Sequence, residues 1–377
     1  MWAVSIDSPA RTRIVESSGG AQYANGWLLS TAGAQRSLVA QRFDPDRLTL
    51  SGDPQPVRDR LAAATSAGEP GFSVSSGGVL VVNRPPPIVH QLTWVDRGGQ
   101  TVGTIGPPAD IYDFALAQDG ARVAADIRDP ESLKSDLWVF DPQRESGTRL
   151  SYQGGISRPM WALDGRHIYL TGQPNFQLRV LTLGAPEAAP FENPGGLVHF
   201  DDETRDGRYF VLKSLAALGS AVWIQRVDDP NTRRPLVQGQ FNAGQARVSP
   251  DGRWLAFMLQ LPPGPEVFVQ PFDRPGDRIQ VSTNGGIGAI WRDDSRELYY
   301  EGREGLMAVP LSERAGALEA GRPQKLFALR TQGLVANYPH NVEVAAHGQK
   351  FLVNAIVGDS NNVPLEVTFN WTAGLKK

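Results

Sequence analysis

The chain has 377 residues, of which 41% are hydrophobic, and its 37 basic and 40 acidic residues leave a formal net charge of −3. This balance excludes the strongly basic surface typical of nucleic-acid-binding proteins. The absence of cysteine excludes disulfides, thiolate metal ligands and cysteine nucleophiles. No apolar stretch of 18 residues is present, and the N-terminus lacks the basic and apolar regions of a signal peptide, so neither a membrane segment nor a signal peptide is expected in this chain.

A hairpin turn recurs along the chain at a nearly constant interval. After two short extended segments, Trp2–Asp7 and Arg13–Glu16, a first four-stranded unit is expected at Gln22–Val57, with its tight turn at Asn25-Gly26. Repeats of about 40 to 45 residues with Asp-Gly type turns between apolar strands are typical of β-propeller blades. The later units are centred on turns spaced 42 to 45 residues apart: Ser76-Gly77, Asp119-Gly120, Asp164-Gly165, Asp206-Gly207, Asp251-Gly252 and Asp294-Ser295.

The unit at Asn242–Thr283 illustrates the pattern. Short turns containing proline or glycine separate four extended segments that alternate apolar and polar residues, as half-buried strands do. These segments are Gln245–Ser249, Arg253–Leu259, Glu266–Phe272 and Arg278–Ser282. The sequence therefore predicts an all-β propeller of four-stranded blades.

The two ends of the chain supply incomplete units. Tyr338–Trp371 contains three strands, and the N-terminal segments resemble the third and fourth strands of a blade. Because an open propeller exposes edge strands, we expect residues 1–17 and 338–371 to share a closing blade. This gives eight blades in a single domain over residues 1–377, with seven blades as the alternative, and a monomer is expected.

Several motifs carry a family resemblance. Gly244–Ala256, which contains Val-Ser-Pro-Asp-Gly-Arg-Trp-Leu-Ala, the segment Glu266–Phe272 and the ending Asn370–Lys376 resemble the TolB-like, WD-repeat-like propeller in the C-terminal half of bacterial serine/threonine kinases. In that family a kinase domain and a transmembrane segment usually precede the propeller. No kinase motif is present here, so the resemblance implies a fragment of a larger bacterial protein. The motifs are turn and packing residues, and they imply a fold rather than a chemistry.

Alternation along the innermost strands predicts which side chains face the central channel. The polar positions form two rings, with His199, His340 and Tyr112 near one mouth. The expected rings are Asp113, Arg158, Gln245 and Asn341, and Asp202, Arg247 and Glu343. Such a set could hold Ca²⁺ or another divalent cation through oxygen ligands. The alternative is that these charges are solvated and pair with one another.

Two functions follow from this channel. The first is a non-catalytic binding or sensory module, with Tyr112, Arg158, Gln245 and Arg247 as ligand-binding residues for a protein, a peptide or a small ligand. The alternative is a metal-dependent hydrolase of an ester, lactone or phosphotriester. In that reading a cation is bound by Asp113, Asp202, Asn341 and Glu343, and His199 or His340 acts as the base. The sequence has no Gly-x-Ser-x-Gly motif, which excludes the propeller-capped serine peptidases as whole enzymes.

Overall fold

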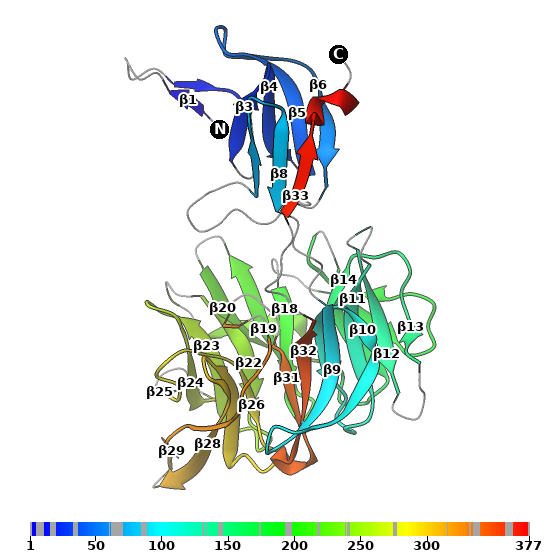
Figure 1. Ribbon diagram of the computed structural model, residues 1–377. Helices are drawn as coiled ribbons and strands as arrows, with labels where there is room; N and C mark the ends of the chain where they lie inside the picture. Colours follow the sequence, from blue (N-terminus) through cyan, green and yellow to red (C-terminus); the bar gives the residue numbers. More distant parts are fainter. Residues whose placement is uncertain are drawn as a thin grey trace. The chain divides into compact units, whose positions relative to one another are not determined.

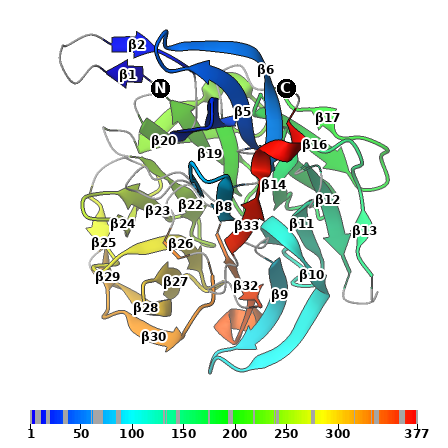
Figure 2. The same cartoon turned by 45° about the horizontal axis from the view of Figure 1, so that its top comes forward.

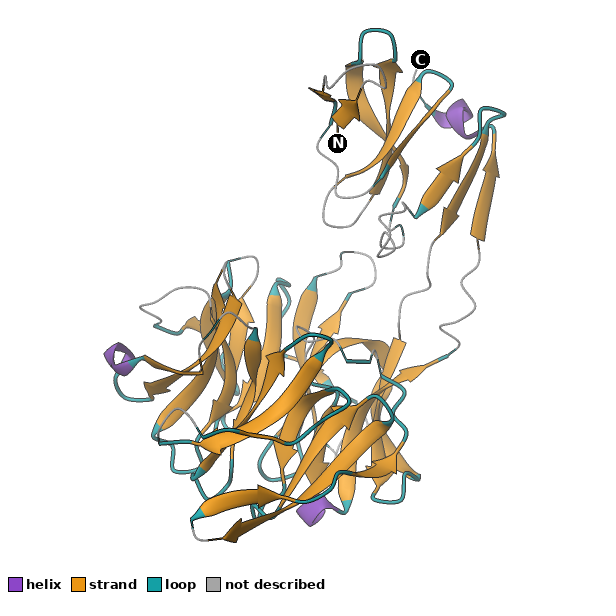
Figure 3. Cartoon of the chain, turned by 90° about the vertical axis from the view of Figure 1, so that its left-hand side faces the viewer, coloured by secondary structure: helices purple, strands orange, loops and turns teal. Residues whose placement is uncertain are grey.

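The structure is a computed structural model of the chain. It describes residues 2–4, 11–15, 20–32, 37–59, 61, 71–83, 89–129, 132, 134–141, 146–172, 175–192, 198–216, 219–237, 239, 242–273, 277–314, 316–331, 333–334, 340–358 and 365–375. Within these ranges the only helical segments are short 3₁₀ turns at Pro230–Thr232, Ala346–Gly348 and Trp371–Gly374, as Figure 3 shows in purple. The predicted all-β fold is confirmed. No helix of the described chain has the length and apolar character needed to cross a membrane.

The chain divides into two compact units. Unit 1 comprises residues 1–88 and 358–377, and unit 2 comprises residues 89–357. Unit 1 is therefore built from both ends of the chain, whereas unit 2 is one continuous segment.

Unit 2 contains six antiparallel blades (Figures 1 and 2). In four of them the strands pair in the order in which they occur in the chain. The first consists of β14 (Ile156–Trp161), β15 (His167–Gly172), β16 (Gln177–Thr182) and β17 (Ala189–Pro190), and the second of β18 (Val198–Glu203), β19 (Tyr209–Ala216), β20 (Gly219–Arg226) and β21 (Arg234–Val237). The third consists of β22 (Ala243–Val248), β23 (Trp254–Gln260), β24 (Pro265–Pro271) and β25 (Ile279–Gln280), and the fourth of β26 (Gly286–Trp291), β27 (Glu297–Gly302), β28 (Gly305–Arg314) and β30 (Gln324–Phe327), with β29 (Ala317–Ala320) pairing the end of β28.

The remaining two blades are joined in one seven-stranded sheet by a long strand. Residues 101–109 of β10 pair with β9, and residues 110–116 pair with β11. The strand order is β13 (Thr148–Arg149), β12 (Ser135–Phe140), β11 (Val123–Arg128), β10 (Thr101–Leu116), β9 (Val89–Asp96), β32 (Lys350–Val357) and β31 (Val342–Ala345).

Strands from both ends of unit 2 close this ring. β32 pairs with β9 from Lys350 opposite Asp96 to Val357 opposite Val89. The innermost strands β10, β14, β18, β22, β26 and β31 contact one another in that order. Apolar side chains between adjacent blades form the core, as Phe257, Val248 and Val222 do between two of them.

Unit 1 contains two larger sheets and a short hairpin. One sheet is β3 (Ala21–Ala24), β4 (Trp27–Ala32), β5 (Ser37–Asp44) and β6 (Thr49–Arg58), and the other is β7 (Phe72–Val74), β8 (Val79–Asn83) and β33 (Leu365–Phe369) in the order β33-β8-β7. Trp27, Leu29, Leu80, Val82 and Trp371 are buried between them. β1 (Trp2–Val4) pairs with β2 (Arg11–Arg13).

The ring closure differs from the expected one in the strands it uses. Residues 350–357 pair with β9, residues 365–369 pair with β8, and within the described chain β1 pairs only with β2. Three consecutive prolines, Pro85–Pro87, separate β8 from β9 in the sequence. Proline lacks the N–H that a tight hairpin would use, which disfavours direct pairing of β8 with β9. The place beside β9 is taken by β32 instead.

The predicted repeats are present as sheets in both units. Six blades lie in unit 2 and two sheets lie in unit 1, so the closed ring of unit 2 has six blades where the sequence count gave eight or seven in one ring. That residues 1–377 behave as a single domain stays a prediction, and an experiment that tests it is given below.

Candidate ligand-binding channel

A β-bulge interrupts the innermost strand of five blades at corresponding positions. The register shifts lie between Ile111 and Asp113, Ser157 and Met160, Phe200 and Asp202, Gly244 and Arg247, and Ile287 and Ile290. In three of them the bulged residue has a positive φ: 55° at Arg158, 53° at Gln245 and 61° at Gly288. A bulge leaves backbone groups unpaired in its own sheet and changes the direction of its side chain.

Side chains of neighbouring blades satisfy these bulged backbones. Asp201 Oδ2 accepts a hydrogen bond from the N–H of Ala246 at 2.9 Å, and Gln245 Oε1 accepts one from the N–H of Gly288 at 3.0 Å. Glu301 accepts from the N–H and the side-chain amide of Asn341 at 2.7 and 3.1 Å. Buried polar groups of this kind stabilise a structure when they are paired. They fix the innermost strands, and therefore the wall of the channel.

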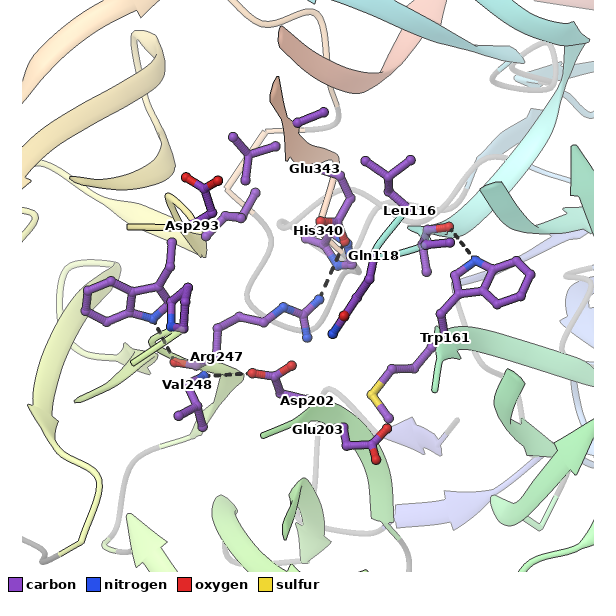
Figure 4. A pocket seen from close by; sticks show the side chains of 18 of the residues that line it. Leu116, Gln118, Trp161, Asp202, Glu203, Arg247, Val248, Asp293, His340 and Glu343 are labelled. Carbon is purple, nitrogen blue, oxygen red and sulfur yellow. Dashed lines mark hydrogen bonds and ion pairs between the residues drawn. The ribbon is translucent and has the colours of Figure 1, made fainter. Parts of the chain in front are cut away.

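The centre of unit 2 holds a cavity of about 440 Å³ (Figure 4). Its charged wall comes from five innermost strands and from the residue two positions before β31. The inward groups are Asp113 (β10), Arg158 (β14), Asp202 (β18), Arg247 (β22), Glu343 (β31) and His340. Towards one end the cavity is lined by the hairpin residues Gln118, Asp119 and Asp293. The cavity is thus a polar channel with both signs of charge.

His340, Glu343 and Arg247 form the central charged group. His340 Nε2 lies 2.7 Å from Glu343 Oε1, and Arg247 Nη2 lies 3.8 Å from the same oxygen. Burial lowers the pKa of His340, but the carboxylate of Glu343 outweighs it and raises that pKa. Burial raises the pKa of Glu343, but the cations His340 and Arg247 outweigh it and lower that pKa. The arrangement therefore favours the charged forms of all three groups.

The two aspartates of the wall are anchored to the backbone. Asp202 Oδ2 accepts from the N–H of Val248 at 2.7 Å, and Asp113 Oδ1 accepts from the N–H of Phe114 at 2.8 Å. Burial raises the pKa of Asp202 to about 6 although Arg247 is nearby, and burial also raises the pKa of Asp113. Both side chains are therefore positioned before any ligand enters.

Three of the predicted site residues lie outside the cavity lining. Asn341 is 1% exposed and bonded to Glu301. His199 Nδ1 lies 3.0 Å from Thr171 Oγ1, and burial lowers the pKa of His199 to about 3. The ring of Tyr112 lies 5.1 Å from the guanidinium carbon of Arg128. The structure brings together the other seven: Asp113, Arg158, Asp202, Gln245, Arg247, His340 and Glu343.

The predicted metal ligands do not form one cluster. In the described residues no group of three or more His, Asp or Glu side chains is close enough to hold a metal ion. Asp202 and Asp113 accept backbone N–H groups, and Glu343 accepts from His340 or pairs with Arg247. The carboxylates of the wall are therefore already partnered within the protein.

Sequence reasoning missed a buried carboxylate behind the wall, that of Asp126. Asp126 lies opposite Asp113 in the β10–β11 pairing and is 1% exposed, and the polar groups that favour its ionised form are the side chain of Ser135, the backbone N–H of Arg158 and the cation of Arg128. Burial raises the pKa of Asp126 to about 8, and Asp113 adds to this shift. A signal was available, because Asp126 stands in the otherwise apolar run Val123–Ile127 of a second strand.

Comparison with known proteins identifies the fold. No protein-family model matches the sequence, and no curated protein matches it either. Among solved structures, a putative TolB from Agrobacterium tumefaciens is 13% identical with a TM-score of 0.55, and the match covers 73% of this chain and 100% of that one. TolB from Acinetobacter baumannii is 14% identical (TM-score 0.46; 80% of this chain, 79% of that chain). The periplasmic gluconolactonase PpgL from Pseudomonas aeruginosa is 16% identical (TM-score 0.44; 80% and 96%). The first of these matches, together with the ring of four-stranded blades, shows that the chain contains a TolB-like β-propeller.

Proposed function

We propose that the propeller of unit 2 is a non-catalytic binding module whose ligand, a protein segment, a peptide or a small molecule, enters the central channel. The observation that carries this proposal is the charged wall of Arg247, Glu343 and Asp202, which surrounds a cavity of about 440 Å³. Ligand sites in proteins are concave and hold a few fixed polar groups. The hydrogen bonds that anchor the wall reduce the ordering needed on binding.

The state of the histidines supports binding rather than catalysis. His340 faces the cavity, but its Nε2 lies 2.7 Å from Glu343 Oε1, and this carboxylate raises the pKa of the ring and favours the protonated form, which cannot accept a proton. His199 is kept neutral by burial, but its pKa of about 3 makes the ring a weak base, and it is buried outside the cavity lining and bonded to Thr171. Neither histidine combines a free lone pair with access to the channel.

A thermal-shift experiment tests the proposal. The full chain is melted with defined sets of amino acids and dipeptides, dicarboxylates, sugar phosphates and polyamines, beside the channel variants Arg247→Ala and Glu343→Gln. A matched control is Arg253→Ala, because Arg253 pairs with Glu313 on the exterior of the protein. The expected result is a compound that stabilises the wild type and the control but neither channel variant. A stabilising compound that acts equally on all four proteins binds elsewhere and contradicts the proposal.

The same experiment also tests the alternative function, a metal-dependent hydrolase. Calcium is added at millimolar concentration, and chromogenic esters are assayed before and after chelation. Stabilisation by calcium that Asp202→Asn removes, together with esterase activity that chelation abolishes, would support the metal-dependent hydrolase. On the sequence resemblance, we further propose that the module belongs to a larger bacterial protein, which the reading frame upstream of Met1 would test.

A further inference from the structure

The outer strand β33 of unit 1 exposes an apolar row. Leu365, Val367 and Phe369 are 62, 49 and 72% exposed, and they alternate along one face of the strand. The neighbouring strand extends this face, because Val81 lies opposite Val367 and Val79 lies opposite Phe369. Contiguous apolar surface of this kind marks an interaction site more often than scattered apolar residues do.

The other face of β33 holds the strand in place. Arg58 Nε donates to Glu366 Oε1 at 2.6 Å, and Arg58 Nη2 donates to Thr368 Oγ1 at 2.9 Å. Trp371, directly after the strand, is buried in the core of unit 1. The apolar row is therefore presented on a fixed strand.

β33 is also an open edge. In the described part of unit 1 it pairs with β8 on one side only, and its sheet has three strands, one fewer than the β3–β6 sheet of the same unit. Natural proteins protect edges with proline, lysine, bulges or very short strands. The outer strands β13, β17 and β25 have two residues each, and β6 carries Pro54 and Pro56. Leu-Glu-Val-Thr-Phe has none of these four protections, and its one charged residue, Glu366, is on the inner face and paired with Arg58.

We propose that β33 pairs with β33 of a second copy of this chain, forming an antiparallel two-fold contact that joins the two three-stranded sheets. The strand is self-complementary in this register. With Val367 opposite itself, Leu365 faces Phe369 on the outer face, and Glu366 faces the uncharged Thr368 on the inner face. No like charges are opposed, and apolar groups meet apolar groups. This dimer replaces the monomer expected from the sequence.

Sedimentation velocity of the full chain tests the contact. One strand from each copy makes an interface below standard size, so association is expected to be weak and to appear between about 10 and 500 µM. Val367→Lys places two lysines opposite each other and should raise the dissociation constant at least about tenfold. The matched control is Val102→Lys, since Val102 is 53% exposed on β10 and should leave association unchanged.

A mixing experiment tests the register itself. Val367→Glu should also be monomeric alone, and an equimolar mixture of the Lys and Glu variants should recover dimers, because residue 367 faces its own copy across the two-fold axis. A wild type that stays monomeric at 500 µM, or a Val367→Lys variant that associates like the wild type, overturns the proposal. Two monomeric variants whose mixture stays monomeric overturn the proposed register.

Discussion

The carboxyl group of Asp126 should make the protein less stable as pH rises. Burial holds the pKa of Asp126 at about 8 in the folded state, against an ordinary value of 3.8. Between these values the folded chain keeps a proton that the unfolded chain releases, so the free energy of unfolding falls as pH rises from about 4 to about 8. The two pKa values differ by roughly four units, and each unit corresponds to about 1.36 kcal/mol. The free energy of unfolding therefore falls by at most about 5 kcal/mol, and the full loss is reached above pH 8.

Asp126→Asn removes this titration with little change in shape. Relative to wild type, the variant should be more stable at pH 9 by up to about 5 kcal/mol. At pH 5 the wild type has lost only about 1.6 kcal/mol of this stability, and the N–H donors that the amide adds cost the variant about 1 to 3 kcal/mol, so the two proteins should differ by no more than about 1.5 kcal/mol. The measurement is thermal unfolding at pH 5, 7 and 9, followed by tryptophan fluorescence.

Asp136→Asn provides the contrasting control. Asp136 is 4% exposed, but its carboxylate accepts from Arg149, Ser151 and the N–H of Gly154. Replacing a partnered carboxylate should lower stability at every one of these pH values, by about 1.5 to 3 kcal/mol. The reasoning about Asp126 fails if its variant and the wild type keep parallel stability profiles between pH 5 and pH 9.

Three further predictions concern the channel and the two units. Glu343→Gln should lower the pKa of His340, measured by NMR titration of the ring, and an unmoved titration would contradict the pairing. The stability gap to wild type should be largest between the ordinary pKa values of the two groups, 4.5 for Glu343 and 6.5 for His340; it should shrink as pH falls through the lowered pKa of Glu343 or rises through the raised pKa of His340. The fragment 89–357 should fold alone with a cooperative melt and a β-type circular dichroism spectrum, whereas aggregation of this fragment would support the single domain predicted over residues 1–377. If the arginines are the partners of the wall carboxylates, calcium should leave the melting temperature of wild type and Asp202→Asn unchanged, whereas a bound cation at a hundredfold excess over its dissociation constant would add about 2.7 kcal/mol to wild type only.

The sequence predicted most of the channel because its turns mark equivalent positions in each repeat. Asp202, Arg247 and Glu343 stand four residues before the hairpin turn or its equivalent, where the strand is regular, and all three line the cavity. Asp113, Arg158 and Gln245, six residues before the turn and at the bulges themselves, also line the cavity. Beyond a bulge the extra residue breaks the simple alternation, so the pattern no longer predicts which face a side chain is on, and Tyr112 and His199, one residue further from the turn, lie outside the lining.

The choice of strand partners was harder to predict than the strands themselves. β9 follows β8 in the chain, and its own sequence is compatible with either β8 or β32 as neighbour. Hydrophobic pattern specifies the face of a strand, but it does not specify which of two similar strands will lie beside it. Asp126 was missed for a related reason: the apolar run Val123–Ile127 indicates that its side chain is buried, but the pattern does not say which strand and which residue lie beside it.

Strands from the N-terminal and C-terminal parts of the chain pair twice, once in each unit, and this has a kinetic consequence. β9 pairs with β32 in unit 2, and the segments just outside them, β8 and β33, pair with each other in unit 1. If thermal motion separates β9 from β32, the pair formed by β8 and β33 still tethers the two segments. Reclosure of the ring is then an intramolecular event, with the effective concentration in the millimolar range that short tethers provide. Pairing within unit 1 would thus shorten the lifetime of the open ring.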